Sequence, residues 1–84
     1  MIDLERLGDK LERSLKDVLI EPSVKAVKND RLKAFLFVVS KSFEKMDDGR
    51  RQSKVWDRVL HTLDQDEQDQ IEFIFTDAPS EIER

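Results

Sequence analysis

Few side chains in this 84-residue sequence offer the chemistry that catalysis or metal binding requires. The chain contains no cysteine and one histidine, His61, so it has no thiol nucleophile, no thiolate ligand and no histidine pair. Asp57 is the nearest candidate to orient His61, but pairs four residues apart are common on helix surfaces, and we interpret His61 as solvated. The acidic run 64–69 lacks the glycine of an EF-hand loop. We therefore predict no catalytic residue, no metal ligand, no cofactor and no enzymatic activity.

The basic residues gather in two local clusters whose charge suits a phosphate group or an acidic partner. Of the 15 lysines and arginines, 13 lie within residues 1–54, although the net charge of the whole chain is −4. The first cluster comprises Lys25, Lys28, Arg31 and Lys33, and the second comprises Arg50, Arg51 and Lys54. Glycine occurs only at positions 8 and 49, so the Gly-x-x-Gly loop with which KH domains hold a nucleic-acid backbone is absent. Together with a pI near 5, this pattern predicts at most weak nucleic-acid binding.

Two amphipathic helices are predicted from apolar residues at spacings of three and four. The first spans 4–19, with Asp3 as its N-cap, and ends before Pro22. The second spans 50–63 and follows a loop over 40–49. Its apolar stripe consists of Val55, Trp56, Val59, Leu60 and Leu63. This spacing predicts that Trp56 lies in the core or at its edge.

Three strands are predicted from runs of β-branched and aromatic residues. The first two, 23–28 and 32–39, form a hairpin around the turn pair Asn29-Asp30, whose residue types tolerate positive φ. The third strand spans 71–76. Its alternation predicts one face that contains Ile71, Phe73 and Phe75.

Short capped segments are expected on either side of the third strand. Before it, Asp64 and Glu67 have the spacing of a capping box over the polar stretch 64–70. After it, Ser80 is predicted to cap a short helix over 81–84.

These elements predict a single domain over residues 1–84, of the α+β class and in the order αββααβ(α). The hairpin is antiparallel, whereas strands 32–39 and 71–76 are separated by a helical crossover, which is typical of a parallel pair. We therefore expect a small mixed three-stranded sheet that packs against the two main helices. The longest apolar run, 34–39, is far shorter than the roughly 20 residues that span a bilayer. Since no signal peptide is evident either, we expect a cytoplasmic protein without membrane association.

The stretch from residue 38 to residue 56 resembles the BolA-like family. Val38-Val39-Ser40-Lys41-Ser42-Phe43 is similar to a family strand that ends in Val-Val-Ser, followed by two variable residues and Phe. Arg51-Gln52-Ser53-Lys54-Val55-Trp56 follows, without a gap, at the spacing of the family's Arg-His-Arg segment. Ala78-Pro79-Ser80-Glu81 looks like the family's Thr-Pro-Glu-Glu segment. The resemblance covers residues 4–82 in element order and implies a fold similar to that of class II KH domains.

The resemblance also implies a role, because BolA-like proteins are linked to transcriptional and stress regulation and share a [2Fe–2S] cluster with monothiol glutaredoxins. This sequence departs from the family at the ligand positions. Gln52 replaces the family's histidine, Ser53 its second arginine and Lys45 its glycine, and the hairpin region 24–32 contains neither cysteine nor histidine. Since glutamine is not a customary cluster ligand, we predict that the iron–sulfur chemistry does not carry over.

We interpret the protein as a small non-enzymatic interaction or regulatory module with an unidentified protein partner. The alternative is a weak nucleic-acid-binding domain that uses the basic hairpin and the start of the second helix. A third interpretation is a homodimer that forms through an exposed strand edge, since an open three-stranded sheet leaves two edges.

Overall fold

The computed structural model describes residues 3–82 and confirms the α+β class. Its elements, in chain order, are α1 (Leu4–Leu15), β1 (Ser23–Lys28), β2 (Ala34–Val39), the 3₁₀ helix η1 (Lys41–Lys45), α2 (Asp48–Thr62), α3 (Gln65–Gln70), β3 (Ile71–Asp77) and α4 (Pro79–Ile82). The strands form one sheet in the order β1-β2-β3, in which β1 is antiparallel and β3 parallel to β2, as predicted. The parallel pair forms because α2 and α3 carry the chain back to the start of β2.

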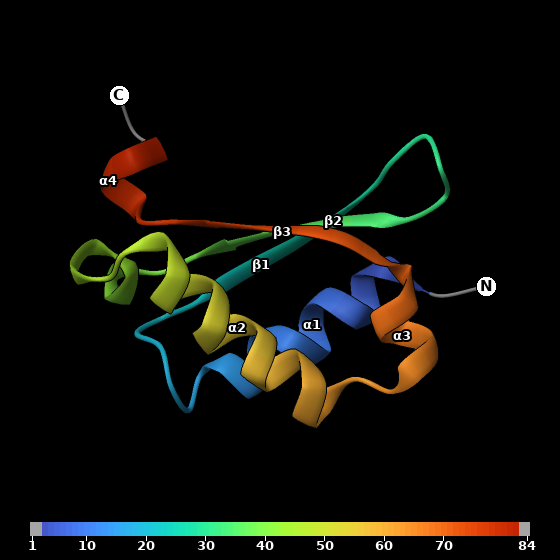
Figure 1. Ribbon diagram of the computed structural model, residues 1–84, viewed down its shortest axis with the longest axis horizontal. Helices are drawn as coiled ribbons and strands as arrows, with labels where there is room; N and C mark the ends of the chain where they lie inside the picture. The colour runs from blue at the N-terminus through green and yellow to red at the C-terminus, as the bar shows by residue number, and fades with distance from the viewer. Residues whose placement is uncertain (1–2, 83–84) are drawn as a thin grey trace.

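The sheet has one covered face and one open face. Helices α1, α2 and α3 lie together on one side of it, whereas α4 and the loop between β1 and β2 rise beyond the other side, at opposite ends (Figure 1). The core is therefore confined to the single layer between the sheet and its helices.

No helix within residues 3–82 combines the length and the apolar character needed to cross a membrane.

The core consists of side chains that contribute almost no exposed surface. The largest of them are Phe43, Leu7, Leu11, Leu15, Leu36, Ile74, Val38, Val55 and Val59. Leucines four residues apart form the buried stripe of α1, which faces the sheet. Gly8 lies in the same stripe, where a Cβ atom would be 3.7 Å from the carbonyl oxygen of Val24, so α1 packs closely on β1.

Helix α1 is shorter than predicted. It ends at Leu15 rather than at residue 19, with Lys16 as its C-cap. Leu19 is nevertheless only 5% exposed, and its N–H donates to the carbonyl of Leu15 at 2.8 Å. The spacing of apolar residues indicates which residues are buried. Leu19 is buried although it lies in the turn after the helix, so the spacing predicted too long a helix.

Helix α2 begins earlier than predicted and has a narrower apolar stripe. It begins at Asp48 because Asp47 caps it and accepts the N–H of Arg50 at 2.8 Å. Leu60, which the spacing placed in the stripe, is 62% exposed, whereas Trp56 packs at the edge of the core as expected. The segment predicted as a loop before α2 also contains η1.

The connection between β1 and β2 differs from the predicted two-residue turn. Strand β2 begins at Ala34, and the positive φ of the connection, 62°, lies at Leu32 rather than at the predicted turn pair. The side chain of Asn29 accepts the N–H groups of Arg31 and Lys33 at 2.9 and 3.0 Å. This local bonding organises a longer loop, and Leu32 is 69% exposed within it.

Strand β3 does not keep the predicted alternation. A register shift in its pairing with β2 makes Glu72 the extra residue of a β-bulge. Ile71 and Ile74 are buried on either side of the bulge, whereas Phe73 and Phe75 are exposed. The prediction that Ile71 shares a face with these phenylalanines is therefore wrong, because the bulge reverses the alternation after Ile71.

The capping box before β3 is confirmed, and the C-terminal helix is displaced. Asp64 and Glu67 exchange the two hydrogen bonds of the box. Helix α4 begins at Pro79, so Ser80 lies inside it, and the N–H of Ala78 donates to the Glu81 carboxylate at 2.7 Å. Residues 83–84 of the predicted helix lie outside the described residues.

Candidate functional site

Gln52 extends from α2 to the free edge of β3, and it stands where the resemblance places a histidine. Its amide nitrogen donates to the carbonyl of Ile74 at 2.8 Å and to the hydroxyl of Thr76 at 3.4 Å. Its amide oxygen accepts the indole N–H of Trp56 at 3.2 Å. Both ends of the amide are therefore engaged within the protein, and the side chain fastens α2 to the sheet.

Arg51, the neighbour of Gln52, is a buried connector of four segments. Its Nε donates to the carbonyl of Met46 at 3.0 Å, and its Nη2 donates to the carbonyl of Phe43 at 2.7 Å. Its Nη1 donates to the carbonyl of Thr76 at 3.2 Å, and both terminal nitrogens bond to the Glu81 carboxylate at 2.7 and 3.0 Å. A planar guanidinium with five donors can satisfy this many acceptors at once.

Arg51 therefore does not belong to the surface cluster in which its position in the sequence placed it. Its side chain is 8% exposed, and its guanidinium lies 5.7 Å from the centre of the Phe43 ring. The hydrogen bond to Glu81 raises the pKa of Arg51 and outweighs the desolvation that lowers it. The charge is thus held in the fold, away from any phosphate or partner.

Both free edges of the sheet receive hydrogen bonds from helix side chains. At the edge of β1, the N–H of Val24 donates to the carboxylate of Glu12 in α1 at 2.9 Å. At the edge of β3, the carbonyls of Ile74 and Thr76 accept from side chains of α2. Within these strands the bonded edge groups are the N–H of Val24 on β1 and the carbonyls of Ile74 and Thr76 on β3, so an added strand would have to pair beside them, and the edge-to-edge homodimer stays a prediction.

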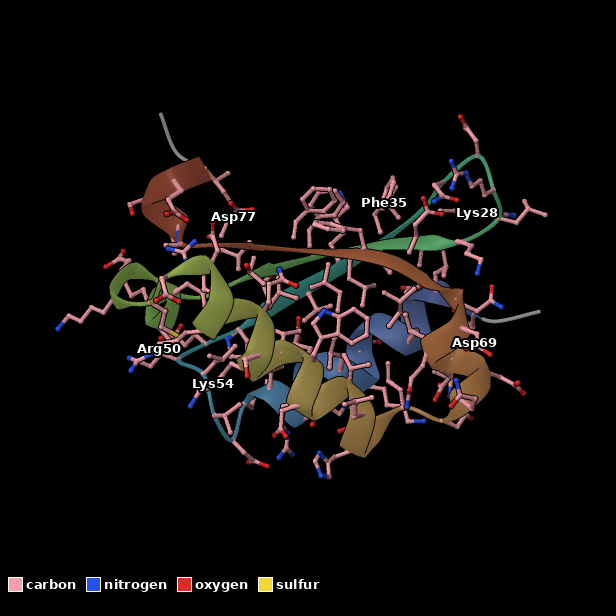
Figure 2. All side chains as sticks on the ribbon, viewed as in Figure 1. Lys28, Phe35, Arg50, Lys54, Asp69 and Asp77 are labelled. Atoms are coloured by element: carbon pink, nitrogen blue, oxygen red, sulfur yellow. The ribbon has the colours of Figure 1, made fainter. Side chains whose placement is uncertain are left out.

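Labelled residues of the two predicted basic clusters lie at opposite ends of the molecule. Figure 2 shows Lys28 at the hairpin end and Arg50 and Lys54 at the opposite end, on the first turns of α2. The structure therefore does not bring the two predicted clusters together into one basic patch. A ligand that contacts one of them has to be long to contact the other, because the molecule is 36 Å along its longest axis.

Within the hairpin cluster, two cations already have partners. The Nζ of Lys33 donates to the backbone carbonyl of Asp69 at 2.9 Å, and Arg31 pairs with Glu72 at 3.4 Å. Lys25 and Lys28 are exposed on β1. An exposed ion pair contributes little to stability, so Arg31 can exchange its partner for a ligand.

The open face of the sheet carries a cluster of aromatic side chains that the sequence predictions did not single out. Its members are Phe35, Phe37, Phe73 and Phe75. The rings of Phe37 and Phe75 stack with centroids 4.9 Å apart and planes 9° apart, and Phe73 packs edge-on against Phe75 at 4.7 Å. Phe73 is 49% exposed. Figure 2 shows Phe35 on the side of the sheet away from the helices, so the cluster forms the outer surface.

The sequence contained a signal for this face. Phenylalanines two residues apart occur in both 35–37 and 73–75, and residues two apart in a strand share a face. The parallel register then pairs Phe35 with Phe73 and Phe37 with Phe75. The bulge in β3 decides that Phe73 and Phe75 face the same way as Phe35 and Phe37, which is why alternation counted from Ile71 misplaced the β3 pair.

The imidazole of His61 and the hydroxyls of Ser14 and Thr62 are hydrogen-bonded within the protein. His61 is exposed, and its Nδ1 donates to the carbonyl of Asp57 at 2.6 Å. A hollow of about 820 Å³ between α1 and α2 is lined in part by Ser14 and Thr62, whose hydroxyls bond to each other at 2.6 Å. Arg58 also donates to Ser14 at 2.9 Å. Within residues 3–82, no group of three or more His, Cys, Asp or Glu side chains is placed to hold a metal ion.

Comparison with known proteins identifies the fold. No known protein family matches the sequence, and no curated protein is similar to it in sequence. Among solved structures, the chain is similar to BolA1 from Arabidopsis thaliana, with a TM-score of 0.61 and 20% sequence identity. The match covers 89% of this chain and 94% of that protein. The fold is thus BolA-like, as the resemblance in residues 38–56 implied.

The buried position of Arg51 predicts a large loss of stability on truncation. Arg51→Met removes every donor to three backbone carbonyls, so we expect unfolding free energy to fall by about 2–4 kcal/mol. Arg51→Lys keeps the charge but not the fork and should recover only part of this loss. The exposed neighbour provides the control, since Arg50→Met should change stability by less than about 0.5 kcal/mol. Urea denaturation measures all three, and equal effects at positions 50 and 51 would contradict the structural role.

Proposed function

We propose, with the BolA-like fold as the premise, that this protein is a small non-enzymatic interaction module of the regulatory kind that binds a protein partner through the open aromatic face. The observation that supports the proposal is the cluster of four phenylalanines on a sheet face that no helix covers. A contiguous apolar patch costs free energy in water and marks a surface that a partner can bury. Aromatic rings are also enriched at the energetic centres of protein interfaces.

The proposal includes no iron–sulfur cluster. Iron ligation at the position of the family's histidine would require a side-chain atom that is free to bind iron. Both ends of the Gln52 amide are instead hydrogen-bonded, one to β3 and one to Trp56. The loop between β1 and β2 supplies no cysteine or histidine as a second ligand. These residues do not fit a [2Fe–2S] cluster. We also propose a cytoplasmic location for the module.

Binding of a protein partner should depend on the phenylalanines of the open face. A tagged bait is incubated with a lysate of cells that express the untagged chain, and captured proteins, further copies of the chain included, are identified by mass spectrometry. We expect Phe73→Ser combined with Phe75→Ser to lose the proteins that the native bait retains, because most of the apolar contact is removed. Leu60→Ser, which alters an exposed leucine on α2, is the matched control. The same proteins on all three baits would refute a role for this face.

Mixing the protein with a cluster-loaded monothiol glutaredoxin should leave the visible absorption of the cluster unchanged. The reason is that both ends of the Gln52 amide are already hydrogen-bonded and that the hairpin contains no cysteine or histidine as a second iron ligand. Absorption and circular dichroism in the visible range provide the measurement. New ligand-field bands with the native protein would overturn this part of the proposal, and bands seen only with Gln52→His would assign the lost ligation to that residue.

Weak binding of single-stranded nucleic acid is the second candidate function. It is favoured by a hollow of about 390 Å³ at the hairpin end, whose lining combines the cations Lys28 and Arg31 with Phe35 and also includes Asp30 and Glu72. Cations beside an aromatic ring suit a phosphate and a stacked base. The cluster at Arg50 and Lys54 lies at the other end of the molecule and does not take part in this site.

The second candidate predicts a salt-dependent affinity that one basic cluster controls. Lys28→Glu combined with Arg31→Glu should abolish binding of a fluorescent single-stranded oligonucleotide at low salt, whereas Arg50→Glu combined with Lys54→Glu should not. With two phosphate contacts, the logarithm of affinity should fall with the logarithm of salt concentration at a slope of about −1.4. Fluorescence anisotropy measures both. An affinity that ignores salt and both double substitutions would exclude nucleic acid.

A further inference from the structure

We infer that the partner of the open face is a second copy of this chain, bound face to face around a twofold axis that runs along β2. This inference rests on the proposed function, since it names the occupant of the same surface. The two sheets would then stack as the layers of a sandwich, with the phenylalanines between them. In an interface of this symmetry, each residue that contacts a residue of the partner is contacted in return.

The strand register fixes the layout of the open face as three rows across three strands. The rows, each written from β1 through β2 to β3, are Ser23–Val39–Asp77, Lys25–Phe37–Phe75 and Val27–Phe35–Phe73. Six of these nine residues are apolar. The two charged residues lie on opposite outer strands, the cation on β1 and the anion on β3.

This separation of charge makes the face complementary to itself. A twofold axis along β2 places β1 of one copy over β3 of the other, so that Lys25 lies one row away from Asp77 of the second copy. One row is two residues, or about 6–7 Å along a strand, and stacked sheets lie about 10 Å apart, a diagonal that extended lysine and aspartate side chains span together. The same operation forms the pair twice, and neither copy places like charges opposite each other.

The other charged groups around the face fit this orientation. Asp77 borders the β3 side, and Lys25 and Lys28 border the β1 side, whereas Glu72 is paired with Arg31 of its own copy. The twofold axis therefore sets a basic border over an acidic border on both sides. Helix α4 rises beyond the open face at the end of β3 (Figure 1) and would flank β1 of the second copy, where its exposed Ile82 can be buried.

The face is too small for a permanent dimer. Nine residues per copy fall well below the 20–30 residues a side of a standard interface. The association should therefore depend on protein concentration. The ring geometry also disfavours a nucleic-acid occupant, because the faces of Phe37 and Phe75 are stacked on each other and acidic residues border the patch.

A charge-exchange experiment on the purified full chain tests the inference. Sedimentation velocity over a wide concentration range should show a monomer–dimer equilibrium for the native protein. Lys25→Asp alone and Asp77→Lys alone should each weaken the dimer about tenfold or more, because like charges then meet twice. An equal mixture of the two single variants should restore dimerisation, since every opposed pair again has opposite signs. Thermal unfolding of dilute samples verifies that each variant folds.

The aromatic part of the interface has its own control. Phe73→Ser combined with Phe75→Ser should abolish the dimer, whereas Leu60→Ser should preserve it. Dimerisation that persists in the phenylalanine variant, or a mixture of charge variants that stays monomeric, would overturn the inference. A native protein that is monomeric at every concentration would also overturn it. If that monomer still captured foreign proteins through Phe73 and Phe75, the proposed function would stand with a different partner.

Discussion

A buried guanidinium is the interaction on which this small fold most depends. Arg51 bonds to the carbonyls of Phe43, Met46 and Thr76 and to the carboxylate of Glu81, so one side chain joins the segment before α2, the edge strand and the last helix. A charge taken out of water is tolerated only when its donors are satisfied, and this requirement fixes the relative positions of those segments. In a chain of this size, whose core is a single layer, such a connector replaces contacts that a larger core would supply.

The same constraint determines which surface remains available. Gln52 and Arg51 bond to two carbonyls at the β3 edge, and Glu12 bonds to one N–H at the β1 edge, so side chains of the covering helices engage part of each edge of the sheet. The helices themselves cover one face. What remains is the opposite face, where phenylalanines rather than charged residues meet the solvent. The association proposed for this protein uses this face rather than the addition of a strand.

Residues that resemble functional groups in the sequence serve the architecture instead. Gln52 lies where the resemblance implies a cluster ligand but fastens α2 to β3, and Arg51 lies in a basic run but is buried. His61 bonds to the backbone of its own helix. These assignments are consistent with a BolA-like fold that acts through surface complementarity. The solved structure of BolA1 from Arabidopsis thaliana shares this fold at 20% identity, a level at which architecture persists while side chains diverge.

The sequence by itself determined the α+β class, the order of elements, the strand directions and the capping box of Asp64 and Glu67, because these follow from local periodicity and local hydrogen bonding. Tertiary structure decided three further features. Leu19 is buried although it lies in a turn. The bulge at Glu72 turns Phe73 and Phe75 outward. Arg51 bonds to acceptors up to 30 residues away in the chain. Each depends on contacts between segments that are far apart in the chain, and the local sequence does not show which segments meet. The aromatic face could be found only once the register was known, since a shift of one residue exchanges the two faces of a strand.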